Sequence, residues 1–128
     1  MNGVAPAAVH FGLGVLPYFP LANGMLTGKV RRGRELPAGT RIATRSHLVT
    51  DEKLDTVEAL IEWGAERGVS LLEIAIGGLA AQPGCASVIA GATSAEQIAA
   101  NAAAGEWEPT AEDLAELDKI SPPPAGEF

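Results

Sequence analysis

Two short apolar segments, residues 13–18 and residues 87–90, predict β-strands. Pro17 and Pro20 end the first segment, and Gly91 ends the second. Helices are predicted around them, so the order is helix, strand, long loop, two helices, strand, two helices. This order is typical of parallel βα units. Because two parallel strands alone would expose unpaired edges and an apolar face, we expect the chain to be part of a larger α/β fold.

Five helices are predicted from their capping residues and from apolar periodicity. They are a helix over residues 4–10, a helix between Thr50 and Gly68, a helix from Ser70 to the turn at residues 82–84, a helix from Ser94 to near Gly105, and a last helix from Thr110 to Ile120. The helix after Ser70 has almost no polar face, so we expect it to be largely buried. The helix after Thr50 has one apolar stripe and is expected at the surface.

Basic and acidic residues are unevenly divided along the chain. Six basic residues and one acidic residue precede position 51, whereas three basic and fifteen acidic residues follow. The total charge of −7 disfavours nucleic acid as a partner. The early basic residues lie in a connection without periodicity, residues 21–49, and loops of this length are typical of lids, binding loops or disorder. This loop could bind a phosphorylated small molecule, or its arginines could serve only solubility.

No segment predicts a membrane, secreted or metal-binding protein. The longest apolar runs are far shorter than the roughly 20 residues of a membrane span, and no secretion signal is recognisable at the start. Cys85 is the single cysteine, and no His/Cys/Asp spacing predicts a metal site. His10 and His47 lack a partner pattern and are expected to serve packing or the surface. We expect a cytoplasmic protein with neither a metal nor a membrane partner.

The segment over residues 87–101 joins the second predicted strand to the start of a helix. The strand breaks at Gly91, and Ser94 with Gln97 predicts a capping box. Such a helix start points free backbone N–H groups out of the carboxyl end of the strand, where they favour an anion such as phosphate. The alternative is that the segment, like most capped helices, binds only water.

Five ordered segments resemble those of the aldo-keto reductases, which are (β/α)8 barrels that use NADPH. They are GVLPYFPLANGMLTGK at residues 14–29, LPAGTR at 36–41, SLLEIA at 70–75, AQPG at 81–84 with the junction described above, and PTAEDL at 109–114. In order, they resemble the family's strand seven, the loop that follows it, the run into strand eight, and the final helix. Together they cover nearly the whole chain.

The resemblance implies an α/β fold class, namely a partial TIM (β/α)8 barrel. It implies the C-terminal portion of that barrel, with two parallel strands and surrounding helices. Residues 1–128 would form the C-terminal half of a single barrel domain, from about helix six, with a long cofactor loop over about residues 20–49 and no second domain. Barrel active sites lie at the carboxyl ends of the strands, and phosphate sites often use the loops after strands seven and eight.

The resemblance also implies an NADPH site. Tyr18 would lie against the nicotinamide ring, and Arg41 would contact a phosphate or ribose. Gln97 and Asn101, one helical turn apart, would contact the edge of the adenine. The full set of cofactor-binding residues that it implies is Tyr18, Phe19, Pro20, Leu21, Asn23, Lys29, Arg41, Gly91, Ala92, Thr93, Ser94, Gln97 and Asn101.

Some positions depart from the family pattern. Phe19 stands where a serine is usual, and Ala100 stands where a glutamate is common. No arginine or lysine lies between Gly91 and Gln97, where many members bind the 2′-phosphate of NADPH. The expectation of NADPH rather than NADH therefore comes from the family.

The resemblance implies an oxidoreductase that interconverts small carbonyls and alcohols by hydride transfer. The family's catalytic tyrosine, lysine, aspartate and histidine come from the first half of the barrel, so no catalytic residue is assigned in this sequence, and this chain alone is expected to be inactive. Tyr18, the sole tyrosine, belongs to the stacking position. The alternatives are a non-catalytic module that binds a nucleotide or a partner, and an unstable relic. The oligomeric state is not predicted.

Overall fold

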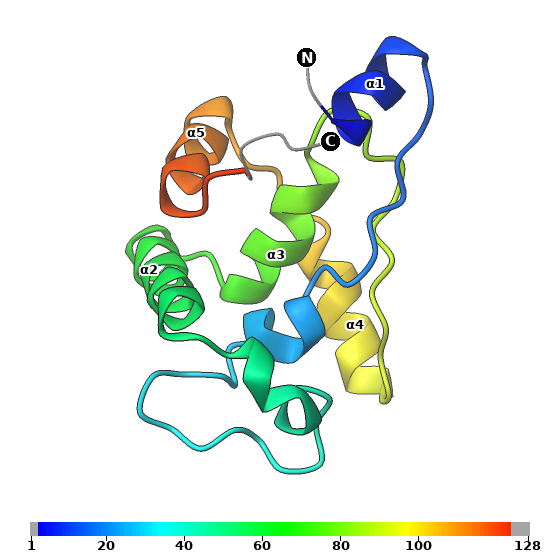
Figure 1. Cartoon of the computed structure of the whole chain (residues 1–128). Coiled ribbons are helices and arrows are strands. Elements are labelled where there is room, and N and C mark those ends of the chain that lie inside the picture. The colour runs from blue at the N-terminus through cyan, green and yellow to red at the C-terminus, as the bar shows by residue number, and fades with distance from the viewer. Residues whose placement is uncertain (1–2, 124–128) are drawn as a thin grey trace.

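The computed structural model describes residues 3–123, and in this range five α-helices and two 3₁₀-helices form (Figure 1). Their bounds are α1 Val4–His10, η1 Ala22–Thr27, η2 Ala43–Leu48, α2 Asp51–Arg67, α3 Leu71–Ala80, α4 Ala95–Ala104 and α5 Ala111–Ile120. The five predicted helices are confirmed. In Figure 1, α3 lies in the middle, with α2 and α5 on one side of it and α4 on the other.

Side-chain caps begin four of these helices as predicted. The Thr50 hydroxyl accepts the backbone N–H of Lys53, 3.3 Å away, at the start of α2. At α3 the capping box is complete, because the Ser70 N–H also donates to Oε2 of Glu73 at 2.7 Å. That bond lowers the pKa of the Glu73 carboxyl. Local hydrogen bonds therefore set these helix starts before any tertiary contact is needed.

The two predicted strands do not form a ladder in the described part of the chain. The two extended segments lie side by side at one edge of the molecule and make two isolated parallel bridges, Val15 with Cys85 and Tyr18 with Ile89 (Figure 1). The parallel direction of the prediction is confirmed, but its regular strands are not. Pro17 lacks an N–H, and neither outer edge has a neighbouring strand to extend the pairing.

The long connection is more ordered than the sequence indicates. It contains η1 and η2, and two of its side chains, Val30 and Ile42, are each only 1% exposed. They belong to the main core, whose buried members are Met25, Val30, Ile42, Val57, Leu60, Trp63, Leu71 and Ile74. The loop is therefore a structural part of the domain, anchored through apolar side chains that contact α2 and α3.

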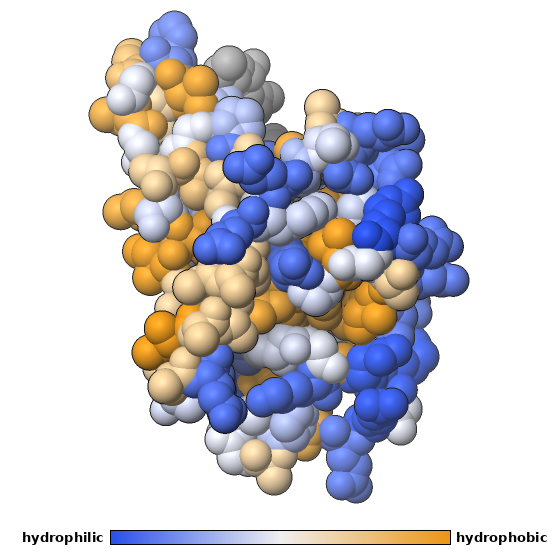
Figure 2. Space-filling model, turned by 180° about the vertical axis from the view of Figure 1, so that it is seen from behind, coloured by the Kyte–Doolittle hydropathy of each residue, from blue (hydrophilic) through white to orange (hydrophobic). Residues whose placement is uncertain are grey.

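Large apolar side chains are exposed along the two extended segments. Leu13 is 62% exposed, Leu16 55% and Ile89 53%. Figure 2 shows orange, apolar side chains running down this edge of the molecule. We call these three residues, with Phe11 and Tyr18, the apolar edge. Exposed apolar surface of this kind is typical of sites that contact another polypeptide, a ligand or a membrane. Within residues 3–123, no helix has the length and apolar character required to cross a bilayer.

Candidate functional site

The turns that follow the two extended segments open into one cavity. Its volume is about 800 Å³, within the range of small-molecule sites. Besides these turns, η1, residues 37–42 of the long loop and the first turns of α4 line it. Tyr18 and Gln97, which are far apart in the sequence, therefore share one cavity.

The structure brings twelve of the thirteen predicted cofactor-binding residues to this cavity. They are Tyr18, Phe19, Pro20, Leu21, Asn23, Lys29, Arg41, Gly91, Ala92, Thr93, Gln97 and Asn101. Ser94 is the exception, since it is not among the lining residues. Its Oγ accepts the backbone N–H of Gln97 at 3.2 Å and caps α4.

Sequence reasoning missed ten of the residues that line the cavity. They are Gly24, Thr27, Pro37, Gly39, Thr40, Ile42, Leu72, Ile89, Ala90 and Ala100. Pro37, Gly39 and Thr40 fall in the loop segment at residues 36–41, which could have indicated them. Leu72 comes from α3, and no local signal in the sequence connects it with the cavity.

The capping box predicted at α4 forms only in part. Oε1 of Gln97 accepts from the N–H and the hydroxyl of Thr93, at 2.7 and 3.0 Å, and not from the Ser94 N–H. The prediction is wrong in this half, because the amide reaches one residue further back along the turn. Asn101 Nδ2 also donates to the carbonyl of Gly91, at 3.4 Å. Two side chains from successive turns of α4 therefore hold the turn over residues 91–94.

The charges of the cavity favour an anion. Lys29 and Arg41 are the charged residues among its lining, and none of the lining residues is acidic. Because a concave surface with charge of one sign concentrates ions of the opposite sign, the cavity attracts negatively charged ligands. Gln97, Ala100 and Asn101 of α4 line the same cavity, so the positive end of the helix dipole lies close to it, although Glu96 in the first turn offsets part of that charge.

Backbone strain is concentrated in the turn after the first extended segment. Phe19, Ala22 and Asn23 have left-handed φ values of 55°, 48° and 62°. This region costs energy for residues other than glycine and is found at ligand-binding turns, where surrounding contacts maintain it. One such contact is the Arg41 guanidinium, which lies 5.5 Å from the centre of the Phe19 ring.

Other groups with reactive side chains lie away from the cavity. His10, His47 and Cys85 are not among the residues that line it. In the described range 3–123, no three His, Cys, Asp or Glu side chains are grouped as metal ligands.

Tyr18 is 72% exposed at the cavity mouth, with its ring tilted against that of Phe19 at 5.0 Å between centroids.

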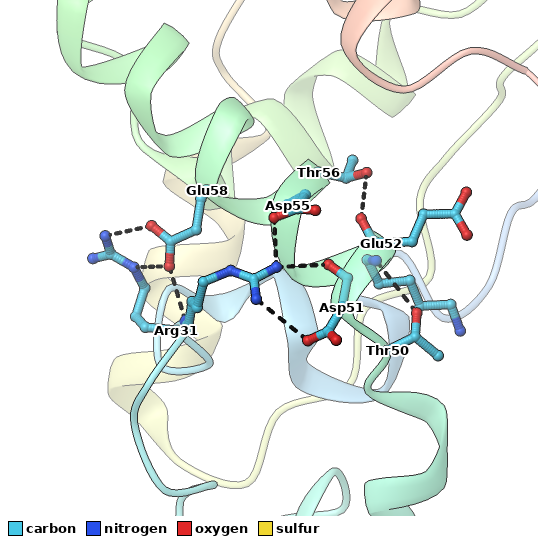
Figure 3. A network of polar contacts seen from close by, with 9 residues as sticks. Arg31, Thr50, Asp51, Glu52, Asp55, Thr56 and Glu58 are labelled. Carbon is cyan, nitrogen blue, oxygen red and sulfur yellow. Dashed lines mark hydrogen bonds and ion pairs between the residues drawn. The ribbon is translucent and has the colours of Figure 1, made fainter.

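The long loop is tied to α2 next to the cavity. We call residues 29–32 its outgoing limb and residues 37–42 its return limb. Arg31 donates from Nε and Nη2 to the two carboxylate oxygens of Glu58, at 2.9 and 2.7 Å. The guanidinium of Arg32 donates to Asp51 and Asp55. Figure 3 shows these three carboxylates of α2 facing the outgoing limb.

The Glu58 carboxyl is expected to titrate far below its usual range. Hydrogen bonds from the Arg31 side chain and the Arg32 N–H, with weaker help from the charge of Arg34, lower its pKa from 4.5 to about 2. Because the folded pKa is below the unfolded one, the ion pair stabilises fully above about pH 4.5, and this stabilisation is lost as the pH falls toward 2. An NMR titration of the Glu58 side-chain carbonyl should show a midpoint near pH 2. Arg31→Gln should raise that midpoint toward 4.5, and an unchanged midpoint would contradict the contact.

Comparison with known proteins gives consistent matches. A family model described as the aldo/keto reductase family matches residues 1–122. A probable voltage-gated potassium channel subunit beta of Oryza sativa subsp. japonica is 39% identical over 102 residues, which are 75% of this chain and 31% of that protein. An uncharacterized oxidoreductase of Bacillus subtilis is 35% identical over 124 residues, 97% of this chain and 37% of that protein.

An L-glyceraldehyde 3-phosphate reductase of Escherichia coli strain K12 is 28% identical over 127 residues, 92% of this chain and 36% of that protein. Among solved structures, a glycerol dehydrogenase of Gluconobacter oxydans superposes with a TM-score of 0.75 at 22% identity. This match covers 98% of this chain and 40% of that one, and it supports the TIM-barrel fold. The chain spans about a third of the length of the curated relatives it matches.

Proposed function

The chain belongs to the aldo/keto reductase family, and on this basis we propose that its cavity binds the dinucleotide cofactor NADPH. When bound, the cofactor would supply the hydride that reduces a small carbonyl, or accept one from an alcohol. The observation that carries the proposal is that the turns after both extended segments open into one cavity whose charged lining residues are cations. A dinucleotide is long, anionic and partly aromatic, and this cavity offers volume, positive charge and an aromatic face.

The proposed binding mode follows the positions of the side chains around the cavity. Tyr18 offers a flat aromatic face to the nicotinamide ring. Lys29 and residues 19–23 lie along the pyrophosphate. Arg41 contacts a phosphate or ribose. The turn over residues 91–93 receives the adenosine phosphate, with Ser94 acting indirectly as the cap of α4.

Gln97 and Asn101 complete the proposed mode at the adenine. Oε1 of Gln97 is already bonded to Thr93, so its Nε2 amide is the group that would donate to the base. The Asn101 amide donates to the Gly91 carbonyl at the long distance of 3.4 Å, which a ligand acceptor could replace. Neither contact depends on a charge on the base, as recognition of a neutral adenine requires.

We further propose that these residues form the C-terminal half of a single barrel domain whose catalytic side chains lie outside this sequence. The apolar edge supports this proposal, because Leu13, Leu16 and Ile89 would be covered by neighbouring strands. The same edge also supports the alternative of a non-catalytic, partner-binding module. The two are distinguished by joining the first half of a family barrel to this chain and measuring carbonyl reduction. Only the barrel proposal requires that the joined protein show turnover.

The cofactor proposal is tested by titrating the chain with NADPH and following its tryptophan and tyrosine fluorescence. Lys29→Gln and Arg41→Gln should each weaken binding by about tenfold or more, since a hydrogen bond to a charged group contributes about 1.5–3 kcal/mol. Lys119→Gln removes the same charge from the exposed last turn of α5 and should leave binding unchanged.

The result that would overturn the proposal is equal weakening by Lys119→Gln and Arg41→Gln, because binding would then reflect overall charge. Absence of saturable NADPH binding by the folded chain would also overturn it. The chain alone, mixed with NADPH and a small aldehyde, is expected to show no oxidation of NADPH. Parallel titration with NADH measures how far the chain prefers the phosphorylated cofactor.

A further inference from the structure

We infer that Arg31 and Arg32 are positioning residues, which hold the long loop against α2 and so keep its return limb, with Arg41, on the cavity. The sequence left two roles open for the arginines of this loop, phosphate binding or solubility. The structure places Arg41 on the cavity, whereas Arg31 and Arg32 are not among the lining residues and contact α2. The part of this inference that concerns binding rests on the proposed cofactor function.

The contacts form a connected network across the gap between loop and helix. Glu58 receives three hydrogen bonds, two from the Arg31 side chain and one from the backbone N–H of Arg32 at 3.0 Å. The Arg32 guanidinium adds bonds to Asp51 and Asp55, one of them to the Asp51 carbonyl at 2.9 Å. A single exposed ion pair contributes little to the free energy of folding. A bidentate arginine–carboxylate pair within a network, in contrast, fixes the relative positions of the two backbone segments that it joins. Side-chain exposure of Arg31 and Glu58 is 32% and 31%, so water screens the pair only in part.

The network lies where the loop packs into the main core. Val30, next to Arg31, is 1% exposed in the main core, and Val57, next to Glu58, is 2% exposed in the same core. Both partners of the bidentate pair therefore come from backbone that core packing already holds. This arrangement reduces the conformational entropy that the ion pair must overcome.

The remainder of the loop is built differently. Gly33 and Gly39 both have left-handed φ values, 73° and 74°, and a Cβ atom at either position would meet nothing within 4 Å. They flank the loop tip, residues 34–38, where Arg34 and Glu35 are exposed. Arg41 follows the second glycine by two residues. Within the tip, Leu36 packs against the main core, and the α2 contacts hold the loop from the side of the outgoing limb.

A fixed outgoing limb affects binding through preorganisation. Val30 holds the backbone next to Lys29 in the core, so loss of the clamp loosens the loop after Val30, from Arg31 toward the return limb with Arg41. A ligand would then have to order the loop as it binds, which weakens affinity without removing any contact to the ligand. Neither Arg31 nor Glu58 needs to touch the ligand for this effect.

Hydrogen–deuterium exchange of the ligand-free chain tests the clamp, with Glu58→Gln as the main variant. Exchange of the hydrogen-bonded loop amides, those of Arg32, Arg34 and Thr40, is expected to rise by about tenfold, while the amides of α3 and α4 keep their rates. Glu62→Gln, one turn further along α2 on an exposed position, removes the same charge and should leave loop exchange unchanged. Glu58→Asp keeps the charge but shortens the side chain, and should give an intermediate rise.

NADPH affinity provides the second readout, and it separates this inference from the cofactor proposal. Glu58→Gln should weaken NADPH binding several-fold, and Glu62→Gln should not. Faster loop exchange without NADPH binding by any variant, wild type included, would support the clamp and overturn the cofactor proposal. Equal loop exchange in Glu58→Gln and wild type would overturn the clamp, whatever the affinities. Far-UV circular dichroism checks that each variant retains its helices. A general rise in exchange that includes the amides of α3 would also overturn the clamp.

Discussion

Replacing Ile42 with alanine is expected to lower the free energy of unfolding by about 2–5 kcal/mol. The Ile42 side chain is 1% exposed and lies in the main core, so its truncation leaves a cavity that α2 and η1 cannot readily fill. A Cβ on Gly24 would lie 3.9 Å from two carbons of Ile42, which shows how closely η1 packs there. Urea denaturation followed by circular dichroism at the helical band measures the change.

The matched control for this prediction is Ile98→Ala. Ile98 lies on α4 and is 61% exposed, so the same loss of carbon atoms should change stability by no more than about 0.5 kcal/mol. If Ile42→Ala does not fold, Ile42→Val provides the measurement, with an expected loss of about 0.5–1.5 kcal/mol. Similar losses for Ile42→Ala and Ile98→Ala would contradict the placement of Ile42 in the core.

The position of Ile42 joins stability to the site. It ends the return limb, follows Arg41 directly, and is among the residues that line the cavity as well as a buried member of the core. The backbone that presents Arg41 is therefore anchored at one end by the same packing that stabilises the domain. Truncating the Ile42 side chain should therefore loosen the return limb as well as destabilise the fold.

Gly77→Ala is expected to destabilise the chain by about 1–3 kcal/mol, although alanine is the better helix former. A Cβ atom at position 77 would lie 2.8 Å from the carbonyl oxygen of Ala104 and 3.0 Å from Cβ of Trp107. The first is a backbone atom of the last residue of α4, and the second is attached directly to the backbone three residues further on, so neither can move aside as the tip of a flexible side chain could. Gly77 thus permits the close approach of α3 to α4, and thermal or urea unfolding measures its replacement.

The adjacent Gly78 provides the matched control. A Cβ atom there would meet only Cζ3 of Trp107, at 3.7 Å, an ordinary van der Waals contact. Gly78→Ala should therefore raise stability by up to about 1 kcal/mol through helix propensity. Neighbouring glycines of one helix are expected to respond with opposite signs, and a change of the same sign at both would contradict the packing of α3 against α4.

The helix starts could be predicted from the sequence because their contacts are local. Thr50, Ser70 and Thr110 each bond a backbone N–H three residues ahead. Distances of this kind are set within one helical turn, so residue type and spacing suffice to predict them. The same holds for Gly68, whose left-handed φ of 70° ends α2 where glycine is favoured.

The strands and the second half of the α4 cap were less predictable. Residue type indicated extended backbone, but regular pairing depends on neighbouring strands that the sequence does not specify. Gln97 had the correct type and spacing for a capping box, yet the turn before α4 offers it Thr93, with both an N–H and a hydroxyl. Where two donors lie within reach of one side chain, only the three-dimensional turn selects between them.

The sequence by itself determined the helices, the ends of the extended segments, the family and most of the residues that line the cavity, because these depend on local patterns and matched motifs. Only the tertiary structure decided which loop cations lie on the cavity and which bind α2. Arg31 and Glu58 are separated by 27 positions, and a lysine or arginine in a loop has the same local pattern whether its partner is a ligand, a carboxylate or water. Which partner such a cation contacts depends on how core packing brings together segments that are far apart in the sequence.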